Sequence, residues 1–380
     1  MSRMLRSACS LISMAAIVAA CSGSGATSSP TSGSGATGTV APSSSLKIGV
    51  VTDVGSITDK NFNQYSYEGA KAAAAALGAT VNYVVPADAS DYTKDIQGFV
   101  DQKFNVIVTV GFNLGDATIT AAKANPTIWF IAVDVAPCVD ATGAPDDTFA
   151  CKGDAKTLLP KLIGIQFEED QAGYLAGMVA AAVSKTGVVG MIGGVNNNPA
   201  VVRYMQGFQM GAVAYKASTQ VKSAFFSTGD VTKAYNDPTW GKTFGAQFIT
   251  QQGVDVLFPV AGGTGNAALD AACTAGIYAI GVDVDEYLSY SSADKCIVTS
   301  AEKHLSNAVQ QTIAAIAAGT AKGGILPFNA ANQGVGYSPF HNTSITLPSD
   351  LQGKLDTAVA AMKAGTLVTC PTKCGTWTGQ

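Results

Sequence analysis

The sequence predicts an α/β protein of two lobes, each built on a doubly wound parallel sheet with helices on both faces. The chain has 380 residues, which is more than one compact domain usually holds. Short apolar runs rich in β-branched residues alternate with longer segments of helical spacing. Charged residues make up 13% of the chain and hydrophobic residues 47%, so the chain can bury a large core and does not have the composition of a disordered protein.

The first 46 residues are predicted to be a targeting signal and a tether, outside the fold. Residues 1–20 place Arg3 and Arg6 before an apolar stretch, the pattern of a secretory signal peptide. The stretch ends in Val18-Ala19-Ala20-Cys21, which resembles a bacterial lipobox, and we expect the Cys21 thiol to be lipidated. Residues 21–46 are almost wholly Ser, Gly, Thr, Ala and Pro, which is typical of a flexible linker. The alternative is an ordinary cleaved signal peptide with an incidental cysteine.

The alternation of strands and helices begins at residue 47. The predicted strands are 47–52, 81–85, 105–110, 128–133, 187–192, 221–226, 254–260, 278–282 and 296–299. The predicted helices are 62–77, 93–103, 116–124, 169–184, 200–216, 239–252, 265–275, 305–317 and 350–362. Strands joined through helices form parallel sheets that are covered on both faces, with right-handed crossovers. A second series of such units begins near residue 164, where we expect the boundary between the lobes.

The cysteines downstream of the linker indicate disulfide bonds. Their number is even, and the signal peptide predicts an exported protein. They form three couples that are close in sequence, although the sequence alone does not fix their pairing: Cys138 with Cys151, Cys273 with Cys296, and Cys370 with Cys374. A metal site is the competing interpretation. We expect none, because the chain has only His304 and His341 and no paired C-x-x-C motif.

Polar residues gather where the predicted strands end. Ligands of open α/β sheets bind at the carboxyl ends of the strands. Asp53, Asp134 and Asp283 each follow a strand directly, whereas Asp59 suits a helix N-cap. The glycine turn at 261–266 exposes backbone N–H groups but lacks both phosphate-binding glycine patterns. The sequence therefore predicts a pocket for a small polar ligand.

The sequence contains no recognisable catalytic constellation. The H-E-x-x-H and G-x-S-x-G motifs are missing, and neither histidine lies at a predicted strand end in the cleft. We therefore expect no catalytic residue, no enzymatic activity and no cofactor. The net charge is −4 and no basic stripe is visible, which argues against binding of nucleic acid.

Several motifs together resemble the basic membrane protein family, the purine nucleoside receptor-like substrate-binding lipoproteins of ABC importers. The most specific are the D-K-x-F-N block at 59–63 and the E-D-x-A-G-Y-L-A-G block at 169–177, with further matches at 111–116, 130–134, 203–208, 281–285 and 300–303. The resemblance covers about residues 47–368. The chain departs from the family at Asn61, where serine is common, and in its additional cysteines.

This resemblance implies a type I periplasmic-binding-protein fold, in which the chain crosses between the lobes three times. The crossings would fall near 164–167, 298–301 and 332–337. The N-terminal lobe would comprise 47–163 and 302–333, and the C-terminal lobe 164–301 and 334–380. Closure about the three hinges would signal the bound state to an ABC permease.

The resemblance also implies a nucleoside ligand, with a purine as the first choice. The base would lie between Phe62 and Trp240, with Asn63, Asp53 and Asp134 facing the ligand from the N-terminal lobe. The ribose would be held near the hinge by Gly262, Asp283 and Lys303. We expect a monomer that is anchored to the membrane on its extracytoplasmic side. The alternatives are a receptor for another small polar ligand, such as a sugar or autoinducer, and a secreted nucleoside hydrolase.

Overall fold

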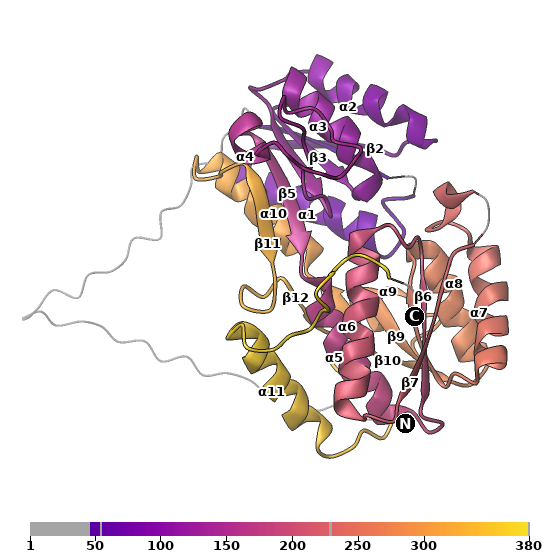
Figure 1. The fold of residues 1–380 in the computed structure, drawn as a ribbon. Helices are drawn as coiled ribbons and strands as arrows, with labels where there is room; N and C mark the ends of the chain where they lie inside the picture. Colours follow the sequence, from indigo (N-terminus) through magenta and orange to yellow (C-terminus); the bar gives the residue numbers. More distant parts are fainter. Residues whose placement is uncertain (1–45, 54, 228–229, 379–380) are drawn as a thin grey trace, which may run out of the picture. The chain divides into compact units, whose positions relative to one another are not determined.

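The computed structural model describes residues 46–53, 55–227 and 230–378 (Figure 1). The predicted signal peptide, the predicted lipidation site Cys21 and all but the last residue of the predicted linker lie outside the described residues. Within the described residues the strands form two six-stranded sheets. Helices lie between successive strands along the chain, except between the last two, so the predicted α/β class with two parallel-dominated sheets is confirmed.

The first sheet has the strand order β11-β5-β4-β3-β1-β2, and its pairs are all parallel. Its central strands are buried along nearly their whole length, because helices cover both faces of the sheet. The strands are β1 (Lys47–Thr52), β2 (Thr80–Val84), β3 (Val106–Val110), β4 (Trp129–Val133), β5 (Leu162–Phe167) and β11 (Gly324–Phe328).

The second sheet repeats this plan in the order β12-β10-β9-β8-β6-β7. Its pairs are parallel except for β12, which runs antiparallel to β10. The strands are β6 (Val188–Gly193), β7 (Gln220–Phe225), β8 (Val256–Val260), β9 (Tyr278–Asp283), β10 (Ile297–Lys303) and β12 (Val335–Tyr337). Each sheet thus places its first and third strands side by side, and the strand order reverses there.

The helices follow the predicted segments within a few residues. The longer ones are α1 (Phe62–Leu77), α2 (Tyr92–Asp101), α3 (Gly115–Ala124), α5 (Glu169–Val183), α6 (Pro199–Tyr215), α7 (Pro238–Gln252), α8 (Gly262–Thr274), α10 (Leu305–Ala317) and α11 (Leu351–Lys363). The short helices α4 (Ala155–Leu158) and α9 (Glu286–Ser289), and the single 3₁₀ turns, have no counterpart in the predicted elements. No helix in the described part of the chain combines the length and the apolar character that crossing a membrane requires.

The sheet pairings move two of the predicted lobe boundaries. The boundary predicted at residue 164 falls inside β5, whose residues 164–167 pair with β4 or β11 in the first sheet. The boundary predicted at residue 302 falls inside β10, and residues 302–303 pair with β12 in the second sheet. Strands β5, β11 and β12 were not predicted. The third crossing was predicted near 332–337; in the structure β11 of the first sheet ends at Phe328 and β12 of the second begins at Val335.

The E-D-x-A-G-Y-L-A-G motif brings α5 and α6 into close contact. A Cβ added at Gly173 or Gly177 would lie within 2.2 Å of a backbone oxygen of α6. The same holds in reverse for Gly207 and Gly211, whose added Cβ atoms would lie within 2.0 Å of backbone oxygens of α5. Only glycine permits this approach of the two backbones. It fixes the position of the N-terminal residues of α5, which reach the site described below.

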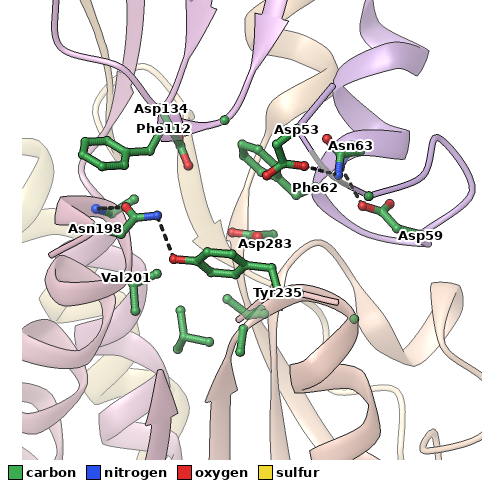
Figure 2. Close-up of a pocket in the computed structure, with 18 of the residues that line it drawn as sticks. Asp53, Asp59, Phe62, Asn63, Phe112, Asp134, Asn198, Val201, Tyr235 and Asp283 are labelled. Atoms are coloured by element: carbon green, nitrogen blue, oxygen red, sulfur yellow. Dashed lines mark hydrogen bonds between the residues drawn. The ribbon is translucent and has the colours of Figure 1, made fainter. Parts of the chain in front are cut away.

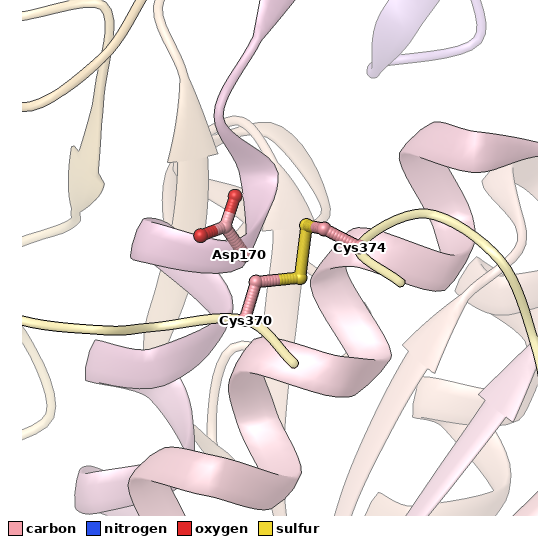
Figure 3. Close-up of side chains that lie close together, drawn as sticks. All are labelled: Asp170, Cys370 and Cys374. Carbon is pink, nitrogen blue, oxygen red and sulfur yellow. A yellow bond between two sulfur atoms is a disulfide. The ribbon is translucent and has the colours of Figure 1, made fainter. Parts of the chain in front are cut away.

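Disulfide bonds join the three sequence-local couples, Cys138–Cys151, Cys273–Cys296 and Cys370–Cys374. The last pair lies beside Asp170 (Figure 3), and these three side chains are the one group of potential metal ligands found among the described residues. Two of its three donors are sulfurs bonded to each other. They cannot act as thiolate ligands while that bond is intact, so we assign no metal to this group.

Candidate functional site

A pocket of about 230 Å³ lies at the carboxyl ends of the strands of both sheets (Figure 2). It is lined from the first sheet by residues that follow β1, β3 and β4, and from the second by residues at or after the ends of β6, β7, β8, β9 and β10. Its lining includes most of the residues that the sequence predicts for a ligand site, namely Asp53, Phe62, Asn63, Asp134, Gly262, Asp283 and Lys303. Trp240 is not among its lining residues.

The ammonium group of Lys303 lies between carboxylates of the two lobes. Its Nζ is 2.6 Å from Oδ2 of Asp134 and 3.2 Å from Oδ1 of Asp283. Glu169, at the start of α5, is 3.9 Å away and in turn pairs with Arg203 at 2.6 Å. The Lys303 side chain is only 3% exposed, so these pairs are largely shielded from water.

Burial and pairing oppose each other in this cluster. Burial raises the pKa of Asp134, while the neighbouring Lys303 lowers it. Burial lowers the pKa of Lys303, but the carboxylates of Asp134, Asp283 and Glu169 more than offset this and hold it above its ordinary value. Lys303 is therefore charged throughout the physiological range and gives the pocket a fixed hydrogen-bond donor.

The backbone aims the two aspartates at this cation. Asp134 follows β4 and Asp283 ends β9, and both have left-handed φ values, 60° and 65°. Aspartate tolerates this conformation better than most residues. The Tyr204 hydroxyl donates to Asp283 Oδ1 at 3.2 Å, which further holds that carboxylate.

A second polar group lies after β1. Asn63 Nδ2 donates to Asp53 Oδ1 at 2.9 Å. Burial raises the pKa of Asp53 to about 6, the bond from Asn63 opposes this rise, and Asp59 adds to it. The N-cap residue of α1 is Asn61 rather than the predicted Asp59, but Asp59 accepts the backbone N–H groups of Asn61, Asn63 and Gln64 and so stabilises the first turn of the helix.

The pocket contains aromatic rings from both lobes. Phe62, from the first lobe, has the Lys303 ammonium 4.7 Å from its ring centroid. Tyr235, from the second lobe, lies against Gly194, where an added Cβ would be 2.3 Å from the ring, and its hydroxyl accepts a bond from Asn198 at 3.0 Å (Figure 2). Phe112 also lines the pocket.

Trp240 lies instead in an aromatic cluster of the second lobe. Its ring stacks on Phe244 with centroids 4.4 Å apart and tilts against Phe226 at 4.7 Å. The prediction that Trp240 faces the ligand therefore has no support in its position. Tyr235, five residues earlier, was missed. Ligands of such sheets bind at the carboxyl ends of the strands, and this rule points to Tyr235, because the residue lies in the segment between β7 and α7.

The chemistry of the lining suits a neutral ligand with many hydrogen-bond donors. Asp53, Asp59, Asp134 and Asp283 are acceptors when ionised, and Lys303 is the single cationic side chain among the lining residues. Asn63, Asn113, Asn198 and Asn236 can both donate and accept. Among the described residues that line the pocket there is no cysteine or histidine, and the side chain of Ser56 bonds to Thr58 rather than to a catalytic base.

Proteins of similar sequence match most of the described chain. A family model for PnrA-like ABC transporter substrate-binding proteins matches residues 46–358. The chain is 29% identical over 330 residues to a protein of Lactococcus lactis named "ABC transporter nucleoside-binding protein BmpA", covering 82% of this chain and 86% of that one. It is 28% identical over 253 residues to basic membrane protein D of Borreliella burgdorferi, covering 66% of each.

Solved structures share the fold at lower identity. An ABC transporter solute-binding protein from Aeropyrum pernix superposes with a TM-score of 0.70 at 20% identity, over 86% of this chain and 94% of that one. A solute-binding protein from Conexibacter woesei superposes with a TM-score of 0.64 at 22% identity, over 85% of this chain and 98% of that one. The family is one of substrate-binding proteins rather than enzymes, and its members deliver ligands to a membrane permease from the extracytoplasmic side. With its two repeated sheets and a pocket at their strand ends, this chain belongs to the PnrA-like family of ABC transporter substrate-binding proteins.

Proposed function

We propose that this protein is a lipid-anchored, extracytoplasmic receptor that binds a nucleoside, with a purine nucleoside as the first candidate, and delivers it to an ABC permease. The observation that carries this proposal is the combination, in one pocket, of a lysine between two aspartates with aromatic rings from both lobes. The name of the Lactococcus lactis relative favours the same ligand class.

The charged cluster suits the ribose. A 2′,3′-diol offers two donors that one carboxylate can accept together, and Asp283 is the carboxylate we assign to them. The Lys303 ammonium would donate to the remaining lone pairs of the sugar oxygens. Such charge-assisted bonds are stronger than neutral ones, so a few of them can hold a small polar ligand.

The aromatic rings suit the base. We assign the faces of the base to Phe62 and Tyr235, so that Tyr235 takes the role that the sequence suggested for Trp240. Stacking on an aromatic ring is worth about 1–3 kcal/mol per base. Asp53 and Asn63 would then bind donors and acceptors on the edge of the base, which is where specificity among bases would arise.

The charge of the lining argues for a nucleoside over a nucleotide. Four aspartates and one lysine surround the space, and a phosphate group would be repelled by the carboxylates. Gly262, at the glycine turn, lines the pocket and begins α8, but the single nearby cation already has carboxylate partners. We therefore expect adenosine or inosine to bind and AMP to bind far more weakly.

The decisive experiment is to identify what the natively purified protein carries. Mass spectrometry of the small molecules released on denaturation should find a nucleoside, and titration calorimetry should then rank inosine, adenosine, cytidine, AMP and free ribose. Tight binding of ribose alone, or of another sugar in preference to every nucleoside, would replace the nucleoside with the sugar-receptor alternative. The appearance of hypoxanthine from inosine during the titration would show hydrolysis and contradict a pure binding role.

A further inference from the structure

Asn61 and Glu286 form a buried hydrogen bond between the two lobes. Asn61 Nδ2 donates to Glu286 Oε1 at 2.9 Å, although the residues are 225 positions apart. Both are 0% exposed. Asn61 precedes Phe62 at the start of α1 in the first lobe, and Glu286 begins α9 in the second. The bond therefore connects the segment that carries Phe62 with the segment that carries Asp283.

The Glu286 carboxyl is held by donors on both of its oxygens. Oε2 accepts the backbone N–H of Val282 at 2.8 Å, next to Asp283. The Asn266 side-chain amide is oriented so that its nitrogen faces two acceptors. It donates to Oε1 of Glu286 at 2.7 Å and to the carbonyl of Gly262 at 3.3 Å. The backbone N–H of Glu286 donates to Ser300 Oγ at 3.0 Å. Small movements of Glu286 would thus be felt at both Asp283 and Gly262 in the pocket.

Neutral donors surround Glu286, and no cation among the described residues forms an ion pair with it. Burial raises the pKa of Glu286 to about 8. The hydrogen bonds from Val282 and Asn61 lower this pKa, whereas the negative charges of Asp283 and Asp59 raise it further. The titratable groups that interact with Glu286 come from both lobes: Asp59 and Tyr65 from the first, and Asp283 and Tyr290 from the second. Further charged or titratable groups lie next to these or to one another, namely Lys60, Asp285, Glu302, Lys303 and His341.

We propose that the Asn61–Glu286 bond is an interlobe latch that holds the pocket closed, and that closure becomes less favourable as Glu286 ionises, because closure then buries a charged carboxylate. Asn61 Oδ1 is buried and has no hydrogen-bond partner. A proton on Glu286 would supply a donor for that oxygen, so the neutral acid and the amide could form two bonds instead of one. Serine at position 61 would have a shorter side chain and no amide nitrogen to offer.

The sign of the pH dependence follows from burial. When the lobes part, water reaches Glu286 and its pKa falls toward the ordinary value near 4.5. Closure therefore takes up a proton. When the pH is well below the ordinary pKa, Glu286 is neutral in both the open and the closed state and has no effect on closure. When the pH lies between the open-state and the closed-state pKa of Glu286, closure becomes less favourable as the pH rises. The equilibrium constant for closure falls by about tenfold for each pH unit in this range. Above the closed-state value the full cost applies.

The test compares Glu286→Gln with the parent. Glutamine keeps a carbonyl oxygen and adds an amide, but it cannot ionise. We expect the two inosine affinities to lie within about fivefold of each other at pH 5, close to the open-state pKa, and the affinity of the variant to be at least about a hundredfold tighter at pH 8.5. Asp285→Asn is the matched control. This control removes a neighbouring carboxylate that bonds to His341 within the second lobe. It should not change the ratio of the inosine affinities measured at pH 5 and pH 8.5.

A second arm does not need a ligand. The latch rests on the two-lobed fold, and only the affinity measurement rests on the proposed nucleoside. Small-angle scattering of the ligand-free parent should show a larger radius of gyration at pH 8.5 than at pH 6, whereas Glu286→Gln should stay compact at both. The Asn61→Ser variant should have the larger radius of gyration at both pH 6 and pH 8.5. In that variant, glutamate and glutamine at position 286 should give the same radius of gyration.

The outcomes separate the two proposals. If inosine fails to bind but scattering follows the expected pattern, the nucleoside assignment is wrong and the latch stands. If Glu286→Gln and the parent behave alike at every pH in scattering, the latch is wrong whatever the ligand. Cooperative thermal unfolding of each variant near the parent temperature is the check that the fold is intact.

Discussion

Asp134 and Asp283 occupy equivalent places in the two sheets, and both contact the ammonium group of Lys303. Asp134 follows β4 and Asp283 ends β9, and each of these strands is third in the order of its sheet. Both aspartates have left-handed backbone conformations. Because Lys303 ends β10, one cation neutralises a carboxylate from each lobe at the point where a ligand would bridge them.

The first prediction concerns the stability that this arrangement provides. In Lys303→Met the carboxylates of Asp134, Asp283 and Glu169 lose their ammonium partner. Leaving buried charges uncompensated should lower the free energy of unfolding by about 3–5 kcal/mol at pH 8. The loss should shrink at pH 5, because burial already raises the pKa of Asp134 and its protonation removes one of the unpaired charges. Urea unfolding at both pH values measures this.

The matched control for Lys303 is Lys354→Met. Lys354 also pairs with an aspartate, Asp350, at 2.8 Å, but both side chains are about half exposed. Water screens such a pair, so its loss should leave the unfolding free energy nearly unchanged. Equal losses for the two variants would show that burial of the Lys303 cluster does not matter to stability.

The second prediction separates Tyr235 from Trp240. Tyr235→Ala should weaken nucleoside binding by about 1–3 kcal/mol, which is roughly one to two powers of ten, because one stacking face is lost. Tyr235→Phe should keep most of the affinity, since it removes only the hydroxyl that bonds to Asn198. Trp240→Ala should bind normally and unfold at a lower temperature, because its ring packs between Phe226 and Phe244. Calorimetric titration with inosine, beside thermal unfolding, decides the matter. The reverse pattern would restore Trp240 as the ligand aromatic.

The third prediction is a pH profile that depends on Asp53. Burial raises the pKa of Asp53 to about 6. If an N–H group of the base donates to this side chain, the ligand binds the ionised carboxylate, so affinity should fall as the pH drops through about 6. Well below that value the fall should approach tenfold per pH unit. Asp53→Asn can still accept a bond but does not titrate, so with Glu286→Gln also present its profile should be flat between pH 5 and 8.

This profile should be measured in the Glu286→Gln background, which removes the opposite pH dependence expected of the latch. If Asp53→Asn leaves the profile in that background unchanged, the carboxylate does not contact the ligand.

The fourth prediction concerns anchoring. Cys21→Ala should move the protein from the membrane fraction to the medium or periplasm, because we assign the lipid to that thiol alone. The fold begins at Lys47, so thermal unfolding and inosine affinity of the released protein should match those of the parent. Fractionation followed by immunoblotting measures the shift. A variant that remains in the membrane fraction would show that another feature anchors the protein.

Much of the fold could be predicted because its signals are local. A buried parallel strand is a short apolar run, and a covering helix is an amphipathic segment, so β1 and α1 are recognisable with nearly their observed bounds. Aspartates at strand ends are visible for the same reason, and the carboxyl ends of parallel strands meet at one edge. The disulfide couples are close in sequence, and the structure joins them as such.

The rest was decided by contacts between distant segments. Whether residues 164–167 belong to the first or second lobe depends on which strands pair with them, and the apolar run itself is the same in either case. Tyr235 and Trp240 are similar aromatic residues five positions apart. Tyr235 precedes α7 and Trp240 lies in its first turn, and only the packing of these segments on their neighbours turns one ring toward the pocket and the other toward Phe244. Asn61 and Glu286 each look like ordinary helix-start residues in the sequence. Their bond exists because folding brings two lobes together and excludes water from between them, which no local pattern encodes.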